Sequence, residues 1–318
     1  MNTGQYIFAQ ITSYLPQRQF RRIVRKYDDR TRGWSISHWN HLLVLMLGQL
    51  LGCRSLRELT DITIAHGKKS LFLGFGKTPV NRQMLSKANS VRDHRIFEEY
   101  AFHMVSIAQR LRITRKFELH GRFYAVDSTT IDLCMSVFAW AKFRSTKSGV
   151  KIHTQVDIAT ELPVFYRITN AIVHDVNAMD WLTYEPNACY VFDRGYFDLA
   201  RLYEINLSRA FYVIREKNQP GYEIVGGEDL LEGTDNVLRD QTVRFTGKRN
   251  KGNYPGVFRR IVYYAPELCR TFTYYTNNFY LPAKDIALLY RYRWQVELFF
   301  YDKLIIMQSQ GMRMILTC

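Results

Sequence analysis

The sequence of 318 residues predicts an α/β protein whose helical N-terminal part precedes a strand-rich part. Three observations lead to this prediction. Up to about residue 112, apolar residues recur every three or four positions, as in amphipathic helices. From about residue 121 they alternate or run continuously, as in strands. Helical spacing returns only in the stretch 282–300. An α/β core that carries a β-rich insertion and ends in a helix is the simplest account.

The N-terminal part is expected to be helical throughout. A basic helix is predicted over 5–26, followed by a break at DDRTRG. Ser37 is placed to cap a helix over 38–52, and Ser55 to cap a helix that begins SLRELTDI. The stretch 80–112 is typical of two helices with Arg and Lys on their polar faces. A helix-turn-helix is possible here, although two consecutive amphipathic helices are more often plain scaffold.

The strand-rich part is expected to hold five strands before the insertion. They are GRFYAVDSTTIDL, GVKIHTQVDI, LPVFYRITNA, CYVFDRGYF and RAFYVIREK, at 121–133, 149–158, 162–171, 189–197 and 209–217. The insertion from 222 to 280 is rich in Gly, Asn, Tyr and Val and shows no helical pattern. It contains four further strand-like stretches, YEIVGGE, TVRFTGK, RRIVYYAP and TFTYYTN.

The composition favours a nucleic-acid partner. Hydrophobic residues make up 47% of the chain, which is enough for real cores, and the net charge is +15. Such an excess of positive charge favours polyanions through phosphate neutralisation and counterion release. Charge alone does not decide the matter, because many basic proteins bind no nucleic acid.

Features of secreted, zinc-binding and membrane proteins are not found in the sequence. The five cysteines form no close pair and no CxxC motif, so neither a zinc site nor a disulfide framework is predicted. The longest apolar run, at 42–52, is about half the length of a membrane-spanning helix. We expect no secretion signal, because MNTGQYIFAQ has no basic segment followed by an apolar one. We therefore expect a cytoplasmic protein with no membrane partner.

Three acids are candidates for a metal site. Asp127 ends the run FYAV and Asp193 ends YVF. An acid at the end of a buried strand is costly unless a positive charge or a metal balances it. The carboxyl ends of adjacent strands in an open sheet converge on one crevice, so these two acids could be neighbours. With Glu297 of the final helix they would offer hard oxygen ligands to one or two Mg²⁺ ions, which can assist phosphoryl displacement.

Each acid taken singly also has a structural explanation. Asp127 precedes Ser-Thr and Asp193 precedes Arg-Gly, which are both ordinary turn sequences. The same caution applies to three further polar residues, which are more often packing or turn residues than ligands: His153, His174 and Asp175. A site is favoured by the combination of two strand-end acids, a helical acid among aromatics and arginines, and strong positive charge.

Four motifs follow one another along the strand-rich part: VDSTTID at 126–132, GVKIHTQVDI at 149–158 with LPVF, VFDRGYFD at 191–198 and YRYRWQVELFF at 290–300. In order and spacing they resemble the DDE transposases of the IS-four family of insertion sequences. The signature there is Tyr, two residues, Arg, three residues, Glu, six residues, Lys. The stretches FAQITSYLPQRQFRRIVRKYDDR and HWNHLLVLMLGQLLGCRSLRELTDI also resemble the helical domain that precedes the core in one branch of that family.

The resemblance implies an RNase H-like catalytic core with a β-rich insertion at about 220–280, preceded by an α-helical N-terminal DNA-binding domain. It divides the chain into a helical N-terminal domain over 1–75, a helical linker region over 76–120 and a DDE catalytic domain over 121–318.

The resemblance also implies the site residues. Asp127, Asp193 and Glu297 would be the catalytic triad and would bind Mg²⁺ or Mn²⁺, as two ions. Contacts with DNA are expected from seven basic or aromatic side chains: Tyr290, Arg293, Lys303 and Arg194 in the core, and Arg21, Arg22 and Arg25 near the N-terminus. The N-terminal arginines would bind the DNA backbone, although a solvated helix face explains them equally well. Trp294 could stack on a displaced base but is expected to pack in the core.

The implied function is cut-and-paste DNA transposition and recombination. The protein would bind the terminal inverted repeats and the target as double-stranded DNA, as a homodimer in the synaptic complex. A metal-bound water would cut one strand, and the freed 3′-hydroxyl would attack a second phosphodiester. The expected location is the bacterial cytoplasm, with nucleoid association when DNA is bound.

The sequence departs from the signature after Glu297. The signature lysine falls on position 304, where this chain has Leu304, and Lys303 comes one residue early. A helix turns about 100° per residue, so Lys303 would point elsewhere. A frameshift or truncation would produce such a pattern. Two alternatives to an active transposase are therefore an inactive truncated remnant and a non-catalytic DNA-binding regulator. A regulator would have no reason to gather the three acids.

Overall fold

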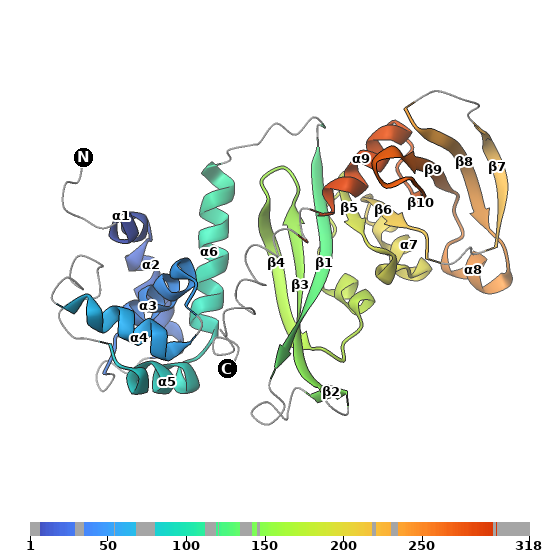
Figure 1. The fold of residues 1–318 in the computed structure, drawn as a ribbon. Helices are drawn as coiled ribbons and strands as arrows, with labels where there is room; N and C mark the ends of the chain where they lie inside the picture. Colours follow the sequence, from blue (N-terminus) through green and yellow to red (C-terminus); the bar gives the residue numbers. More distant parts are fainter. Residues whose placement is uncertain are drawn as a thin grey trace. The chain divides into compact units, whose positions relative to one another are not determined.

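The computed structural model divides into two compact units between residues 111 and 112. The first unit is helical and the second contains a sheet (Figure 1). The predicted domain boundaries, after residues 75 and 120, stay predictions. The structure describes residues 7–28, 35–53, 55–67, 80–111, 119, 121–133, 142–144, 147–217, 221–229, 235–294 and 297. No helix in these ranges is long and apolar enough to cross a membrane.

The described part of the N-terminal unit consists of helices α1 Ile7–Ser13, α2 Gln17–Tyr27, α3 His38–Leu51, α4 Leu56–Ala65, α5 Arg82–Val91 and α6 Arg95–Leu111. Ser37 and Ser55 each accept a hydrogen bond from the backbone N–H three residues ahead, so both predicted caps are confirmed. The single helix expected over 5–26 is instead two helices. Pro16 separates them, because proline has no N–H with which to continue a helix.

Two apolar clusters hold these helices together. In the first, α3, α4 and α5 bury leucines against one another: Leu43, Leu47, Leu59 and Leu85. In the second, the ring of Phe20 in α2 lies 4.9 Å from the ring of Tyr100 in α6, in an edge-to-face contact. Packing on these sides leaves the basic faces of α2 and α5 exposed.

The second unit is built on one sheet of ten strands. They are β1 Arg122–Leu133, β2 Lys142–Arg144, β3 Lys147–Asp157, β4 Leu162–Asn170, β5 Ala188–Phe192, β6 Phe211–Arg215, β7 Tyr222–Asp229, β8 Val237–Phe245, β9 Phe258–Ala265 and β10 Arg270–Thr276. Each predicted strand is present, and β2 is the addition in the described residues.

The strands follow the order β2-β3-β1-β5-β6-β10-β9-β8-β7, with β4 paired to β3. β1, β5 and β6 are parallel to one another, whereas the other pairings are antiparallel. The strands predicted as an insertion, β7 to β10, continue the same sheet through the pairing of β10 with β6. They form an extension of the central sheet.

Six short helical segments complete the described part of this unit: the 3-10 turns η3 Asp175–Trp181, η4 Arg194–Tyr196 and η5 Pro266–Leu268, and the helices α7 Leu199–Leu207, α8 Lys248–Asn253 and α9 Ala283–Tyr292. The prediction that 222–280 contains no helix is wrong, because α8 lies within it. Its sequence KRNKGN has no apolar residue, so apolar spacing could not reveal it.

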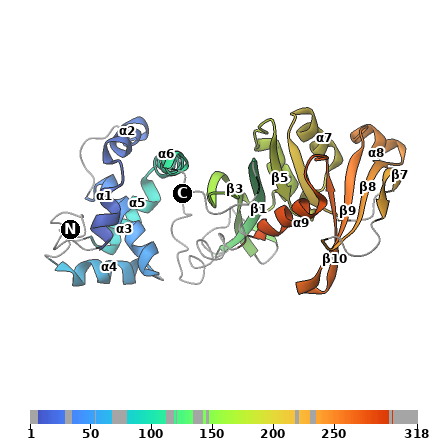
Figure 2. The same cartoon turned by 90° about the horizontal axis from the view of Figure 1, so that it is seen from above.

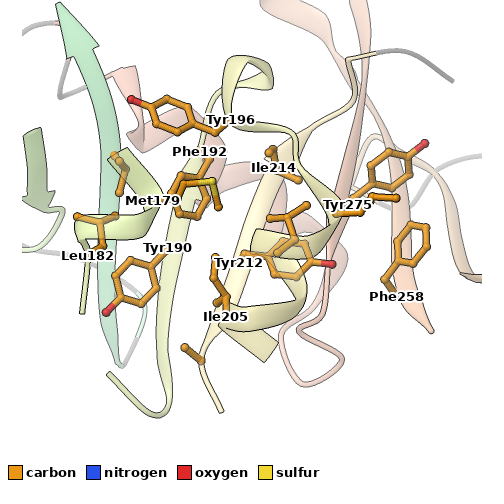
Figure 3. Close-up of a cluster of buried hydrophobic side chains, with 14 of the residues drawn as sticks. Met179, Leu182, Tyr190, Phe192, Tyr196, Ile205, Tyr212, Ile214, Phe258 and Tyr275 are labelled. Carbon is orange, nitrogen blue, oxygen red and sulfur yellow. The ribbon is translucent and has the colours of Figure 1, made fainter. Parts of the chain in front are cut away.

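Helices α7 and α9 cover opposite faces of the sheet (Figure 2). Successive residues of a strand point to opposite faces. Tyr190 and Phe192 of β5 join Ile205 of α7 in the main core, as Figure 3 shows. On the other face, the ring of Tyr274 in β10 lies 4.7 Å from the ring of Tyr290 in α9. A residue that directly follows Phe192 therefore faces α9.

Candidate active site

Two of the three predicted acids lie next to each other on the α9 face of the sheet. The parallel pairing of β1 with β5 places Val126 opposite Phe192, and the next residues along the chain are Asp127 and Asp193. Val126 and Phe192 belong to the core on the α7 face. Alternation therefore turns both aspartates toward α9. Asp193 directly follows β5 as predicted, whereas β1 continues past Asp127 to Leu133, so Asp127 lies where the pairing of β1 with β5 ends and not at the end of its strand.

Arg293, the residue that follows α9, links Asp127 to Glu297. Its Nη1 donates to Asp127 Oδ2 at 2.7 Å, and its Nη2 donates to Glu297 Oε1 at 2.8 Å. The side chain of Arg293 is 6% exposed and that of Asp127 is 15% exposed. The guanidinium is thus a buried cation that balances two of the three acids.

Tyr290 contacts the remaining acid. Its hydroxyl donates to Asp193 Oδ1 at 3.1 Å. Burial raises the pKa of Tyr290 to about 12, so the hydroxyl keeps its proton at neutral pH. Asp193 precedes η4 but its side chain makes no capping hydrogen bond, so its carboxylate does not serve as a helix cap. Tyr290 and Arg293 are both buried against acids, and their contact with phosphates stays a prediction.

The electrostatics of the site reflect its burial. Burial raises the pKa of Asp127 to about 6, whereas Arg293 and the backbone N–H of Ser128 act to lower it. The nearby carboxylates of Glu297 and Asp193 add to the rise. Burial acts to lower the pKa of Arg293, but the adjacent Asp127 and Glu297 hold it above its ordinary value. A buried carboxylate such as Asp127 calls for a positive charge nearby, and Arg293 supplies it.

A second polar cluster lies behind Asp127. Ser128 donates its backbone N–H to Asp127 Oδ1 at 2.8 Å and its hydroxyl to Asp175 Oδ1 at 2.6 Å. Lys151 Nζ lies 2.9 Å from the same carboxylate oxygen of Asp175 and also donates to the Val173 carbonyl. Burial acts to raise the pKa of Asp175, but Ser128 and Lys151 hold it below its usual value. The cluster ties the backbone beside Asp127 to η3.

Sequence reasoning missed this use of Asp175. It was interpreted as a packing or turn residue, and it does open η3. The available signal was the adjacent pair His-Asp in NAIVHDVN, but only the pairing of β1 with β3 shows that Ser128 and Lys151 lie close to each other. His153 is a packing residue, with its Nε2 3.0 Å from Thr169 Oγ1.

The other predicted contact residues do not join the acids. Arg194 is exposed beside Asp193, and the three N-terminal arginines are exposed on α2 in the other unit: Arg21, Arg22 and Arg25. Lys303 and Leu304 lie outside the described residues. The expectation that Trp294 packs in the core is wrong, since it is 55% exposed. Arg293 turns inward, and the next residue lies about 100° further around a helix.

The donor set fits a divalent cation, although Arg293 separates two of the three acids. Among the described residues, no three Asp, Glu, His or Cys side chains lie close enough to hold a metal ion. Arg293 stands between Asp127 and Glu297 instead. Carboxylate oxygens are the ligands that Mg²⁺ prefers. With Arg293 displaced, Asp127, Asp193 and Glu297 are the residues that could hold such an ion.

The chain matches two protein families. "Transposase DDE domain" matches residues 118–303, which include all three acids. "Domain of unknown function (DUF4372)" matches residues 3–76 in the helical unit.

Two curated relatives are similar to this chain. "Putative transposase y4zB" from Sinorhizobium fredii (strain NBRC 101917 / NGR234) is 33% identical over 219 residues, covering 68% of this chain and 60% of the relative. "Probable transposase for insertion sequence element IS5377" from Geobacillus stearothermophilus is 29% identical over 176 residues, covering 55% of this chain and 46% of the relative. The chain therefore spans 60% and 46% of the lengths of these two relatives.

Two solved structures resemble the chain distantly. The piggyBac transposase synaptic complex with hairpin DNA gives a TM-score of 0.45 at 10% identity, covering 96% of this chain and 70% of that one. Endonuclease V from Bacillus subtilis gives a TM-score of 0.26 at 11% identity, covering 67% of this chain and 96% of that one. Neither likeness is close enough to define the function.

Proposed function

We propose that this chain, which belongs to the transposase DDE domain family, is the DNA transposase of an insertion sequence of the IS-four type. The observation that carries the proposal is the link from Arg293 to both Asp127 and Glu297. It joins β1, through Asp127, to the stretch after α9 that carries Glu297, and the hydroxyl of Tyr290 in α9 reaches Asp193 after β5. Separate turn or packing roles for these residues would not require such a meeting.

The topology supports an RNase H-like interpretation of the central strands. β4, β3 and β1 are antiparallel, and β1 is followed in the sheet by the parallel strands β5 and β6. The two aspartates lie where β1 and β5 meet, and the stretch after α9 brings the glutamate. In this interpretation, β7 to β10 are the insertion between β6 and the last helix of the core.

The proposed chemistry is two successive phosphoryl transfers. Hydrolysis adds the oxygen of water to the phosphorus at the end of the element and releases its 3′-oxygen as a hydroxyl. That hydroxyl then attacks a target phosphodiester, whose own 3′-oxygen leaves. Transposases with a DDE domain depend generally on divalent metal, and Mg²⁺ or Mn²⁺, as two ions, would activate the water and stabilise both reacting oxygens.

The residues of this chain would supply the positioning. Asp127, Asp193 and Glu297 would hold the ions. Tyr290 orients Asp193 through its hydroxyl, and the N–H of Ser128 orients Asp127. Arg293 neutralises the acids before the substrate arrives, and once displaced it would offer bidentate hydrogen bonds to a DNA phosphate.

Contacts with DNA are proposed on both units. Arg194 lies exposed beside the site, and the exposed ring of Trp294 offers a surface on which an unstacked base could lie. Arg21, Arg22 and Arg25 would bind the backbone of the terminal inverted repeats. A homodimer would hold two element ends together in the synaptic complex. The alternative of a non-catalytic regulator is not favoured, because the family match covers the strand-rich half.

Cleavage of an end-labelled duplex that carries the terminal repeat, with Mg²⁺ or Mn²⁺, tests the proposal. Asp127→Asn should abolish cleavage and leave duplex binding intact, because the amide keeps the shape but loses the charge. Asp235→Asn is the matched control. Asp235 is 60% exposed and lies at a positive φ that asparagine tolerates, so this variant should cleave normally. Cleavage by Asp127→Asn at the wild-type rate would refute the assignment of the triad.

A further inference from the structure

The N-terminal unit has an open groove between the start of α4 and one face of α5. Its volume is about 670 Å³. The polar side chains along it include Arg57 from α4 and five residues from α5: Arg82, Gln83, Ser86, Lys87 and Ser90. The groove is thus built mainly from one face of α5.

That face of α5 is free because the helix buries its other side. Leu85 and Ala88 are buried in the cluster shared with α3 and α4, so residues spaced three and four apart on the opposite side point outward. Arg82 and Lys87 are exposed there, as are the polar residues between them. Asn81 caps the helix by accepting from the backbone N–H of Met84. The exposed side chains are therefore presented on a helix with a fixed start.

The cations of the groove are not neutralised within the described residues. Arg57, Arg82 and Lys87 form no ion pair with a described acid. By contrast, two other cations of the same unit are paired, Lys26 with Glu99 and Arg95 with Asp93. The acids of α4, Glu58 and Asp61, line a separate hollow that shares Arg57. The positive side of the groove is consequently the α5 side.

We propose that this groove binds the sugar–phosphate backbone of duplex DNA. The inference rests on the proposed function and adds a second DNA contact to the one proposed on α2. Arg and Lys neutralise phosphates, and serine hydroxyls and a glutamine amide donate hydrogen bonds to phosphate oxygens.

The chemistry of the groove favours a duplex over a single strand. Proteins that grip single strands stack the bases on aromatic rings. Among the described residues that line this groove there is no aromatic side chain. A groove that contacts only the backbone does not read sequence, so a change there should weaken binding to every duplex equally.

Fluorescence anisotropy of the full chain tests this inference, using the terminal-repeat duplex and a scrambled duplex of equal length between 50 and 200 mM salt. Removing two phosphate contacts in Arg82→Gln/Lys87→Gln should reduce the slope of log affinity against log salt by about 1.8. The wild-type affinity should then fall by about twelvefold more than that of the variant across this range. Both duplexes should respond alike, and Arg82→Lys/Lys87→Arg should restore the slope.

The matched control is Arg95→Gln/Arg110→Gln, which removes two charges from α6 of the same unit and should keep the wild-type slope. An unchanged slope in the α5 variant, or an equal loss in the control, would overturn the inference. If the wild-type chain binds and cleaves DNA while the α5 variant matches it, only the groove assignment fails. If the wild-type chain binds neither duplex, both the proposed function and the groove assignment fail.

Discussion

Arg293 and Asp127 form an ion pair with 2.7 Å between Nη1 and Oδ2, and the two side chains are 6% and 15% exposed. A second nitrogen of the same guanidinium reaches Glu297. A side-chain cation therefore occupies the position between acids that the proposed function reserves for metal. The protein without metal should depend on this arginine for stability, and metal should compete with it.

Replacing Arg293 by glutamine tests that dependence. The change leaves Asp127 buried without its cation, and breaking a buried pair from one side costs about 3–5 kcal/mol. We expect the free energy of unfolding of the metal-free variant to fall by that amount, as measured by urea unfolding. Millimolar Mg²⁺ should stabilise the variant more than the wild type, because no side chain has to be displaced.

Arg291→Gln serves as the control for that experiment. Arg291 lies two residues away, is 73% exposed and pairs with Glu267 at the surface. Exposed pairs contribute at most about 1 kcal/mol. Similar losses in the two variants, or an equal response to Mg²⁺, would show that Arg293 does not stand in for a metal.

Patterns that repeat locally made most of the fold predictable. Alternating residues predicted β1, β3 and β4, and the serines before α3 and α4 predicted where those helices begin, because capping involves only neighbouring residues. α8 was missed because its sequence contains no apolar residue. Apolar spacing likewise says nothing about which strand pairs with β6, so the sequence did not predict that the insertion would extend the central sheet.

The site was predictable in its residue types and less so in its contacts. The strand-end argument suggested that Asp127 and Asp193 meet, and the register of β1 with β5 places them together, although β1 continues past Asp127. That Arg293 and Tyr290 would turn to these acids depends on where α9 crosses the sheet, which is a long-range property. The contacts of Asp175 depend likewise on tertiary structure, because Ser128 and Lys151 approach it from different strands.

Tyr290→Phe isolates the hydroxyl bond to Asp193. The ring contact with Tyr274 remains, so the free energy of unfolding should fall only by the contribution of one hydrogen bond to a charged group, about 1.5–3 kcal/mol. Groups that orient metal ligands typically affect metal affinity or activity by about 10- to 100-fold. We expect half-maximal cleavage to require that much more Mg²⁺, measured as a titration of initial rates. The control Tyr280→Phe, at a ring that is 85% exposed, should leave the titration unchanged. An unaltered titration in Tyr290→Phe would remove this tyrosine from the positioning of Asp193.

Asp175→Asn tests whether the cluster behind Asp127 positions that acid. The amide can still accept from Ser128 but no longer balances Lys151, whose side chain is 12% exposed. We expect slower cleavage with unchanged affinity for the terminal-repeat duplex. Combining Asp175→Asn with Ser128→Ala should cost less than the sum of the two single changes, because the hydrogen bond that Ser128→Ala removes is weaker when its acceptor is neutral. Additive losses in cleavage rate would mean that Asp175 acts independently of Ser128.

His41 makes the stability of the helical unit depend on pH. Burial, assisted by the positive charge of Arg92, lowers the pKa of His41 from 6.5 to about 4. Its Nε2 lies 2.6 Å from Asn89 Oδ1 and is assigned as the donor. Between pH 6.5 and about 4 the unfolded chain binds a proton that the folded unit excludes, so stability is complete above pH 6.5 and falls as the pH drops toward 4. The full effect is on the order of 3 kcal/mol.

Urea unfolding at pH 7.5, 6, 5 and 4.5, followed for His41→Gln beside the wild type, measures this contribution. Glutamine keeps a donor for Asn89 but does not titrate, so the difference in unfolding free energy between the two proteins should shrink steadily below pH 6.5. His94→Gln, at an exposed histidine between α5 and α6, controls for the loss of a surface imidazole and should run parallel to the wild type. A constant difference between His41→Gln and the wild type across the range would mean that His41 binds protons equally well in the folded and unfolded chains, and that its burial does not oppose its charge.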